Sequence, residues 1–345
     1  MKDITHEIAE HIQSTTTQRK ELAKNLRQSN PELIQQVQNQ DLNNLKVCGV
    51  DGGFLKKEFQ GMTLLLRRAV GVCFEYKNNQ VNAQYLPNKN PTPEPIVIPP
   101  NFSEPDTTTL ANLKRVELEI STAIKSVETF KPDIMVLDGS IVVYPSSIPE
   151  KNSVAYETYK QVIMLFRQLY ELCTKEQVLL VGANEDSRGR KFCQILKKQL
   201  LKDKPESAVL DTTNDTTFLY HLLNDCEKTV PFSYSENEDV PSLADLGEWK
   251  NKIYALYLKP CKFDRPLRLD FLATQNPQVN ADKISAIIHA ISYQNRTYAY
   301  PSVLIEADAR AKLSEKDLAV FKKALFEKIG NDPTIFDLRR ETRPI

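Results

Sequence analysis

The sequence predicts an α/β fold built on a mixed sheet, because strand-like and helix-like segments alternate through its central part. Short runs of β-branched and aliphatic residues bounded by turn residues are typical of buried strands, and they lie at 46–50, 133–137 and 178–182. Segments with apolar residues at helical spacing, 107–128 and 153–173, precede the second and third of these runs. At 345 residues the chain is long enough to bury a large core in one or two domains.

The first 45 residues differ from the rest of the chain. Ile4, Ile8 and Ile12, and further along Leu22 and Leu26, fall at helical spacing among charged and amide residues. This pattern predicts two or three amphipathic helices without a core of their own. We therefore expect a helical segment at 1–45 that serves docking or dimerisation, followed by one domain at 46–345.

The order of elements in that domain is informative. A strand ending at Asp51, a second at 62–76, an asparagine turn and a third at 81–86 predict an antiparallel meander. The proline-rich stretch 87–105 is expected to be an extended loop. Helix 107–128, strand 133–138, helix 153–173, strand 178–182 and a basic helix to about Lys204 follow. Two strands, 252–259 and 267–272, and C-terminal helical additions complete the chain.

This order is the topology of ribonuclease H-like folds, and the resemblance is at the level of the fold. In such folds the first strand and the fourth are neighbours, and acidic metal ligands stand at their carboxyl ends. The resemblance therefore implies that Asp51 and Asp138 lie side by side. Fold alone does not establish chemistry, which depends on the residues of the site.

Both of these strands run into an aspartate followed by glycine, in Asp51-Gly52-Gly53 and Asp138-Gly139. Two carboxylates on neighbouring strands can hold a hard divalent cation against a phosphate. Asp-Gly is also a common turn dipeptide, and either copy alone is better explained by a turn than by a metal ligand. Two copies, each after a buried strand, favour a metal site.

A third acidic ligand is expected from the helix at 107–128, which carries Glu117 and Glu119. At about 100° per residue, Glu117 lies close to the apolar face between Leu113 and Ile120, whereas Glu119 lies well off it. A carboxylate on a buried face is costly unless it is paired or bound to metal, so Glu117 is the better ligand candidate. The alternative is a slightly rotated helix on which both glutamates face solvent.

Two further features could contact nucleic acid. Arg188, Arg190 and Lys191 stand where a strand passes into a basic helix, and such side chains could hold a polyanionic strand. Such a run is also typical of a solvated helix face. Tyr300 could stack on a base or bond a phosphate, or it could simply belong to a Tyr-Pro turn that packs on the core.

Composition excludes some classes of protein. The 45 basic and 45 acidic side chains balance, so the chain does not coat nucleic acid by net charge alone. The six cysteines are widely spaced, with no Cys-x-x-Cys pair, which argues against a zinc cluster and for reduced core residues. No apolar signal region or run of membrane-spanning length is present, so we expect a cytoplasmic protein with no membrane partner.

Taken in order, the motifs resemble those of NurA-type nucleases. The segments that carry the resemblance are Val50-Asp51-Gly52-Gly53, Val116-Glu117-Leu118-Glu119-Ile120, Val136-Leu137-Asp138-Gly139-Ser140, Val181-Gly182 through Ser187-Arg188, and Tyr300-Pro301 through Glu306-Ala307-Asp308. Each motif is short, and the specificity comes from their joint order over residues 46–313.

The resemblance implies a ribonuclease H-like core and Mn²⁺-dependent nuclease activity on DNA, with Mg²⁺ as a second candidate cation. It implies 5′ to 3′ exonuclease and single-strand endonuclease modes, and a homodimer docked on a hexameric HerA-type ATPase that translocates DNA. This assembly would act in double-strand break resection, and so in DNA repair.

Carried over by position, Asp51, the Glu117/Glu119 pair and Asp138 would be metal ligands, and Tyr300 would match a functional tyrosine. Asp308 stands where the family pattern has histidine after Glu-Ala. Aspartate can bind Mn²⁺ but cannot supply a neutral imidazole for proton transfer, so the change could alter metal choice or slow the reaction.

Two other functions are compatible with the same residues. A non-catalytic scaffold could dock on an ATPase through the N-terminal helices without binding metal. A sugar kinase or actin-like ATPase is suggested by the strand Gly49-Val50-Asp51-Gly52-Gly53, which resembles the phosphate-binding strand of that fold. Such kinases contain a second meander, and none is evident after residue 205.

Overall fold

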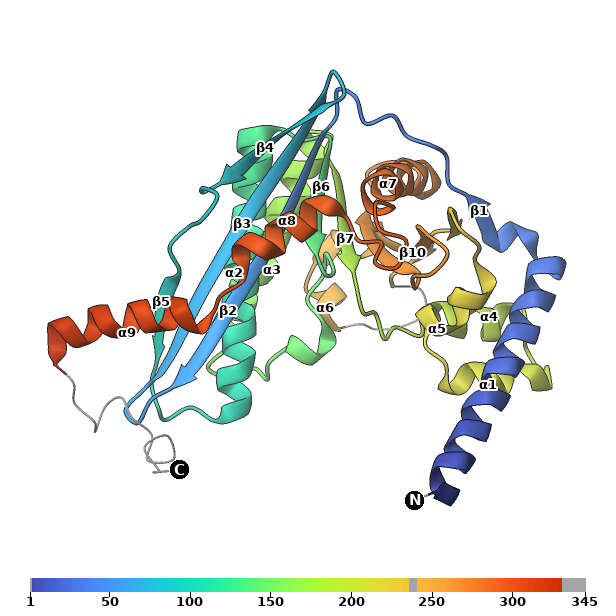
Figure 1. The fold of residues 1–345 in the computed structure, drawn as a ribbon, viewed down its shortest axis with the longest axis horizontal. Helices are drawn as coiled ribbons and strands as arrows, with labels where there is room; N and C mark the ends of the chain where they lie inside the picture. The colour runs from blue at the N-terminus through green and yellow to red at the C-terminus, as the bar shows by residue number, and fades with distance from the viewer. Residues whose placement is uncertain (1, 236–240, 331–345) are drawn as a thin grey trace. The chain divides into compact units, whose positions relative to one another are not determined.

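The computed structural model describes residues 2–235 and 241–330 (Figure 1). These residues fall into two compact units. The meander unit is drawn from residues 43–180, 237–250 and 303–345, and the α1 unit from 1–42, 181–236 and 251–302. The last part of the expected domain, residues 331–345, lies outside the described residues. Among the described residues, no helix combines the length and apolarity needed to cross a membrane.

The meander unit is built on one mixed set of strands, as the sequence predicts. Strand β2 pairs with β3 in antiparallel register, β3 pairs with β4, and β6 lies parallel to β2. Asn78 and Asn79 both have positive φ, which is the backbone that a tight hairpin between β3 and β4 requires. The strands are β2 (Lys46–Glu58), β3 (Thr63–Lys77), β4 (Gln80–Leu86), β5 (Glu94–Ile98) and β6 (Ile134–Asp138).

Two local expectations are wrong. Strand β2 does not end at Asp51 but continues to Glu58, and β3 pairs with it over the whole length, with Asp51 opposite Val70. The proline-rich stretch is not wholly a loop, because β5 pairs with the first residues of β3, from Thr63 to Arg67. Only Gly139, with φ of +97°, makes the turn expected after an aspartate.

Helices cover both faces of these strands, and the glycines of β2 show how closely they approach. A Cβ on Gly53 would lie 2.6 Å from the carbonyl oxygen of Ala311 in α8. A Cβ on Gly52 would lie 3.3 Å from Glu119 in α2. Figure 1 shows α8 crossing one face of β2, with α2 and α3 on the other. The helices are α2 (Glu104–Phe130), α3 (Tyr156–Lys175), α6 (Pro241–Ala244), α8 (Ser302–Ala311) and α9 (Glu315–Ile329).

In the α1 unit the strand order is β1–β8–β10–β11–β7, and β9 pairs with β10. The strands are β1 (Ile34–Gln36), β7 (Leu179–Asn184), β8 (Glu227–Thr229), β9 (Phe232–Ser233), β10 (Ile253–Lys259) and β11 (Leu267–Leu272). The helices are α1 (Lys2–Ser29), α4 (Lys191–Gln199), α5 (Asp215–Leu222) and α7 (Pro277–Ser292). Helix α4 is shorter than expected and ends before Lys204.

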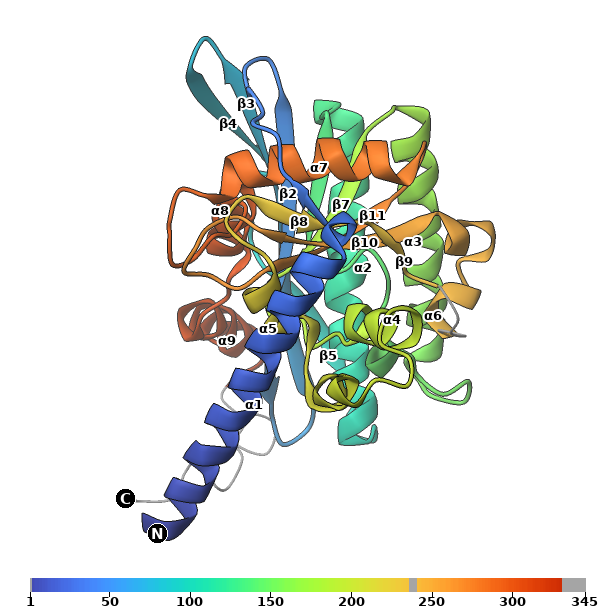
Figure 2. The ribbon, with the colours of Figure 1, turned by 90° about the vertical axis from the view of Figure 1, so that its right-hand side faces the viewer.

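The N-terminal segment is one long helix and a short strand, not two or three helices. Pro31 follows α1 and begins a short 3₁₀ turn, after which β1 pairs with β8. The second half of α1 packs through Leu22, Ala23 and Leu26 into a core that includes residues of α4 and α5 (Figure 2). The role of this segment in docking or dimerisation stays a prediction.

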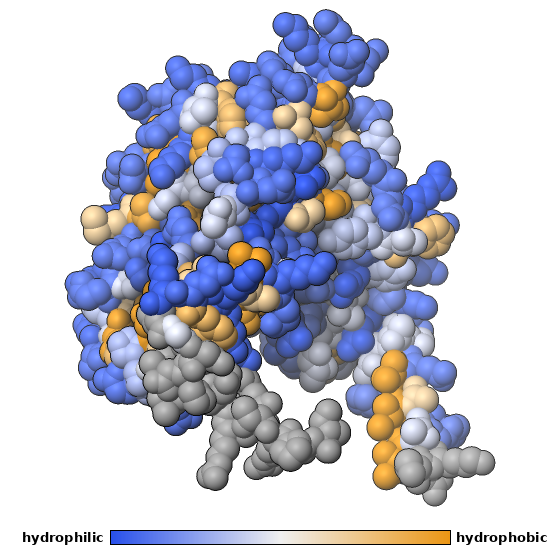
Figure 3. All heavy atoms as spheres, turned by 60° about the vertical axis from the view of Figure 1, so that its left-hand side comes forward, coloured by the Kyte–Doolittle hydropathy of each residue, from blue (hydrophilic) through white to orange (hydrophobic). Residues whose placement is uncertain are grey.

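The first half of α1 carries an exposed apolar stripe. Ile4, Ile8 and Ile12 follow one another at helical spacing and are 62%, 53% and 56% exposed. Figure 3 shows this stripe running along the helix. Isolated apolar side chains on a surface are ordinary, but an aligned row of three is typical of a helix face that meets a partner.

A buried aspartate connects α4 to the strands of the α1 unit. The Asp215 carboxylate accepts hydrogen bonds from the N–H groups of Phe192 (3.0 Å) and Cys193 (2.8 Å) in the first turn of α4, and from the Tyr257 hydroxyl (2.8 Å). Its side chain is fully buried, and burial raises its pKa. Asp215 thus serves the unpaired donors at the start of α4.

Candidate metal centre

Asp51 and Asp138 lie next to each other on adjacent parallel strands. Their preceding residues, Val50 and Leu137, are partners in the β2–β6 register. Because side chains alternate between the faces of a sheet, the two aspartates share a face. Strand β6 ends at Asp138, while β2 continues past Asp51. The adjacency expected from the order of elements is therefore confirmed.

Asp51 is a strongly perturbed carboxyl group. Only 5% of the residue is exposed. Burial, and then repulsion from the Asp138 carboxylate, raise the pKa of Asp51 to about 7, although the Gly52 N–H donates to its Oδ1 at 2.6 Å. Two carboxyl groups this close cannot both ionise without cost, and a divalent cation between them would remove that cost.

Glu119 on α2 lies against Gly52 of β2, and the charges of Asp51 and Asp138 act on its carboxyl group. Glu119 is 3% exposed, and burial, together with the charges of Asp51 and Asp138, raises its pKa well above the usual range. The Arg115 guanidinium opposes this shift, donating from Nη1 to Glu119 Oε2 at 2.6 Å and to the Gly52 carbonyl at 3.2 Å. We define Asp51, Glu119 and Asp138 as the carboxylate cluster.

A cavity of about 190 Å³ opens beside the carboxylate cluster. Glu119, Asp138 and Arg115 line it together with Ser140 and Tyr144, and the rest of its wall is mainly apolar. Tyr144 is 46% exposed and comes from the segment after β6. The cavity therefore gives solvent-sized species a polar, partly enclosed place next to two of the three carboxylates.

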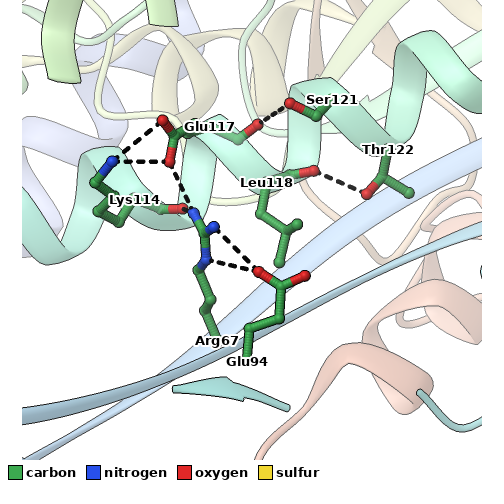
Figure 4. Close-up of polar contacts among 7 residues, drawn as sticks. All are labelled: Arg67, Glu94, Lys114, Glu117, Leu118, Ser121 and Thr122. Atoms are coloured by element: carbon green, nitrogen blue, oxygen red, sulfur yellow. Dashed lines mark hydrogen bonds and ion pairs between the residues drawn. The ribbon is translucent and has the colours of Figure 1, made fainter. Parts of the chain in front are cut away.

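The sequence argument placed Glu117, rather than Glu119, on the buried face, and this placement is wrong. Glu117 accepts from Arg67 at 2.9 Å and from Lys114 at 3.1 Å, in a network that extends to Glu94 (Figure 4). Its side chain keeps 19% exposure and lines a different, more open depression. Salt bridges already use both of its oxygens, and the causes that raise the pKa values of Asp51 and Glu119 do not include it.

Helix packing explains the error. Periodicity identifies the apolar face of α2, but the polar strip with Glu119, Thr122 and Ser126 is buried as well. This strip faces β2 and β3 where both strands carry glycine, since a Cβ on Gly71 would lie 2.2 Å from Ser126 Oγ. The sequence signal that could have identified Glu119 is the match of Gly52 and Gly71 in the strands with the polar strip of α2 that contains Glu119 and Ser126.

Asp308, on α8, lies beside the part of β2 that contains Asp51. Leu304 approaches Gly49 and the Ala311 carbonyl approaches Gly53, so α8 runs along the strand face that carries Asp51. The seven helical steps from residue 304 to residue 311 span about 11 Å at 1.5 Å each. The four strand steps from residue 49 to residue 53 span about 13 Å, so equivalent positions of α8 and β2 lie side by side along this length. Asp308 lies between these two helix contacts, and its side chain is exposed.

Tyr300 and the basic residues belong to the α1 unit. Tyr300 is 7% exposed and donates its hydroxyl to the Ala183 carbonyl at 3.0 Å, with Tyr298 packed beside it. Arg188 is exposed, whereas Arg190 donates to the carbonyls of Leu210 and Asp211. Lys191 is half-buried.

Sequence reasoning missed two arginines that neutralise buried carboxylates. Arg115 pairs with Glu119 at (i, i+4), a spacing that could have been recognised on the helix. Arg268 is buried in the α1 unit and donates to Asp270 at 2.8 Å, while Asn184 donates to the same carboxylate at 3.0 Å. Arg268 and Asp270 alternate with leucine in β11, and this alternation is the sequence signal that could have identified the pair.

Within the described residues, no group of three histidine, cysteine or acidic side chains is arranged to enclose a metal ion. The chemistry of the carboxylate cluster still fits one. All its donors are oxygens, which suits Mn²⁺ or Mg²⁺. The pKa values of Asp51 and Glu119 are raised first by burial and then by neighbouring carboxylates, and a bound cation would lower them.

Comparison with known proteins decides the family. The NurA domain model matches residues 45–313. The chain belongs to the NurA family. No curated protein is similar enough in sequence to count as a relative.

Solved structures show the same fold. The NurA nuclease from Sulfolobus solfataricus has 15% identity and a TM-score of 0.61, and the match covers 94% of each chain. A second NurA structure has 11% identity and a TM-score of 0.58, covering 95% of this chain and 98% of that one. NurA with manganese has 11% identity and a TM-score of 0.53 over the same shares. The family expected from the motifs is thus confirmed.

Proposed function

We propose that this protein is a divalent-metal-dependent nuclease that hydrolyses DNA. The carboxylate cluster carries the proposal: Asp51 on β2 and Glu119 on α2 are buried, and Asp138 at the end of β6 is half-buried. The charge of Asp138 helps to raise the pKa of both buried groups, that of Asp51 to about 7. Membership of the NurA family and the solved NurA nuclease support it. Mn²⁺ is the proposed cation, supported by the solved NurA structure with manganese, and Mg²⁺ is the second candidate.

The strand arrangement supports a ribonuclease H-like core. The meander β2–β3–β4 with β6 parallel to β2 is the order that such a core requires. It also explains why the two aspartates come from strands far apart in the sequence. Strand β6, the parallel neighbour of β2, ends at Asp138, which is the point where the ligand would enter.

In this mechanism Asp51, Glu119 and Asp138 would hold the divalent cation. Bound divalent cations would lower the pKa of water and neutralise charge that develops on the phosphate. Arg115 holds the Glu119 carboxylate through the 2.6 Å hydrogen bond, so that this oxygen keeps its place in the cluster. The apolar wall of the neighbouring cavity limits water around the carboxylates, which strengthens charge interactions there.

Five side chains receive supporting roles. Asp308, at the level of Asp51 on α8, is proposed as a further metal ligand in place of the family histidine, and it cannot supply a neutral imidazole. Tyr300 is proposed to position the α1 unit's contact with DNA, and Arg188 and Lys191 to bind phosphates. Arg190 uses part of its guanidinium on backbone carbonyls and is proposed as a structural support for the others.

The family resemblance supports an assembly as well as an activity. We propose a homodimer that docks on a hexameric HerA-type ATPase and acts as a 5′ to 3′ exonuclease and single-strand endonuclease in DNA-end resection. The balanced charge of the chain suits a nuclease to which a motor delivers DNA. The exposed isoleucine stripe on α1 is the proposed contact with the second copy.

Digestion of end-labelled single- and double-stranded DNA tests the activity. The protein and its Asp51→Asn variant are compared with Mn²⁺, Mg²⁺ or a chelator, alone and with a HerA-type ATPase. Cleavage that needs the cation and is lost in Asp51→Asn supports the proposal. If the unmodified protein cleaves nothing under any of these conditions, the scaffold function takes its place.

Two glutamates on one helix provide a matched control. Glu119→Gln removes a charge from the carboxylate cluster, whereas Glu117→Gln removes one from the Arg67 network only two residues away. We expect Glu119→Gln to lose at least about tenfold in Mn²⁺ affinity, because outer and inner ligands commonly contribute 10–100-fold, and Glu117→Gln to change it little. The reverse order would restore the assignment of Glu117 as a ligand.

A further inference from the structure

The α1 unit contains a second chemical site that the nuclease proposal does not use. A cavity of about 660 Å³ lies between the end of β10 and α7. Its wall includes two thiols, an imidazole, two exposed aromatic rings and two cationic side chains. These are Cys226, Cys261, His289, Phe263, Tyr293, Lys262 and Arg296. All six cysteines are free, so the thiols are available.

Cys226 and His289 form a hydrogen-bonded pair. Sγ lies 3.2 Å from Nε2. The imidazole also bonds the backbone of Pro260, which offers only a carbonyl oxygen, so the ring donates there. Because Nε2 faces the sulfur, Nδ1 is the nitrogen left to make that bond. Nε2 is then the acceptor, and the Cys226 S–H donates to it.

The orientation of the imidazole is held from two sides. The Pro260 carbonyl selects the tautomer, and the Tyr293 ring stacks on the imidazole with centroids 5.3 Å apart and planes 15° apart. His289 is 9% exposed, which leaves it little room to turn. A nucleophile, a base in contact with it and a third group that orients the base make up an activated-thiol arrangement.

Both members of the pair rest in their neutral forms. Burial raises the pKa of the Cys226 thiol and lowers the pKa of His289. A neutral imidazole has a free lone pair on Nε2, and a neutral thiol needs a base at the moment it attacks. His289 is placed to be that base.

The side chains around the Cys226–His289 pair indicate which kind of molecule could react with the thiol. Lys262 and Arg296 supply two positive charges to the cavity wall, and Asp225 supplies one negative charge. The charges of Asp225 and Glu227 add to burial in raising the pKa of the Cys226 thiol, so the preference for an anion rests on Lys262 and Arg296. Phe263 and Tyr293 are 60% and 56% exposed, so their faces can receive a planar group. An anionic molecule with an aromatic or planar part fits this wall better than a cation.

We propose that Cys226 is a reactive thiol, activated by His289, that exchanges with anionic low-molecular-weight disulfides and so becomes S-thiolated. The Cys226 sulfur attacks one sulfur of the disulfide, its proton passes to His289 Nε2, and the S–S bond of the ligand breaks. The leaving thiolate takes the proton from His289 and departs as a free thiol. Cys226 is oxidised to a mixed disulfide, and half of the ligand is reduced.

Reaction with 5,5′-dithiobis(2-nitrobenzoate), a dianionic aromatic disulfide, tests the proposal on the full-length protein under native conditions. Release of thionitrobenzoate gives the rate, and peptide mass mapping gives the position. Cystamine, a dicationic disulfide, is the comparison. The variants are Cys226→Ser, His289→Asn, Lys262→Ala and, as the matched control in the same cavity, Cys261→Ser.

We expect one fast equivalent at Cys226, absent in Cys226→Ser and retained in Cys261→Ser. General bases typically contribute 10²–10⁴-fold, so His289→Asn should slow this phase at least about 100-fold. Lys262→Ala should slow the anionic reagent severalfold and leave cystamine unchanged. Equal rates at Cys226 and the buried cysteines, or a faster reaction with cystamine, would overturn the proposal. Cys226 is half-buried and the other five cysteines are buried, so its rate is also compared with that of free cysteine toward the same reagent at the same pH. A rate at Cys226 no higher than that of the free thiol would overturn the proposal even if His289→Asn does not fold.

Discussion

Replacing Gly71 with alanine should separate α2 from the sheet. The new Cβ would lie 2.2 Å from Ser126 Oγ and 3.4 Å from Ser126 Cβ, and the first distance is shorter than any real contact. Overpacking of this kind costs about 1–3 kcal/mol, whereas alanine gains roughly 0.5–1 kcal/mol over glycine in a strand. We expect Gly71→Ala to lower the free energy of unfolding by about 1–2 kcal/mol.

Ser126→Ala should reverse the loss. Ser126 is fully buried, and within the described residues its hydroxyl has no hydrogen-bond partner, so its removal should stabilise the protein by up to about 1 kcal/mol. With the hydroxyl gone, the Gly71→Ala change leaves only the 3.4 Å contact. The double variant should therefore be at least as stable as the parent, with a coupling energy of about 2 kcal/mol.

Urea unfolding of the parent, both single variants and the double variant measures this cycle. Mn²⁺ binding is the second readout, because Glu119 lies on the same helix, two turns before Ser126. A displaced α2 would weaken cation binding in Gly71→Ala, and the double variant would recover it. If Gly71→Ala is as stable as the parent, or if the double variant is no better than the single one, the close packing of α2 on β3 is refuted.

Three further predictions concern stability and assembly. Asp51→Asn should stabilise the metal-free protein at pH 8 but not at pH 4. The pKa of Asp51 is raised from 3.8 to about 7 in the folded state, so between these pH values the folded state binds a proton that the unfolded state has lost. The free energy of unfolding of the unmodified protein therefore falls as pH rises through this window, by at most about 4 kcal/mol. Asp215→Ala should cost about 3 kcal/mol in urea unfolding, because three buried donors lose their acceptor; a loss below 1 kcal/mol would contradict this. Serine at Ile4, Ile8 and Ile12 together should leave the unfolding midpoint unchanged and convert a dimer to a monomer in light scattering; an unchanged mass would exclude the stripe as the contact.

Much of the meander unit could be predicted because its signals are local. Apolar runs bounded by turn residues identified β3, β4 and β6, and the resemblance of their order to ribonuclease H-like folds implied that β6 lies beside β2. The extent of β2 could not be predicted in the same way. Glycine after aspartate is typical of a turn, yet Gly52 and Gly53 are extended because Glu119 and Ala311 lie against them.

The sequence alone determined that two apolar strands each run into an aspartate, and the resemblance of the element order to ribonuclease H-like folds implied that these aspartates meet on neighbouring strands. It did not determine which glutamate joins them. Hydropathy reports the apolar face of a helix, whereas Glu119 is buried on a polar strip of α2 that glycines at 52 and 71 allow against the strands. The Cys226–His289 pair likewise depends on residues 63 positions apart. Only tertiary packing decides such contacts, since they join elements whose separate patterns carry no record of one another.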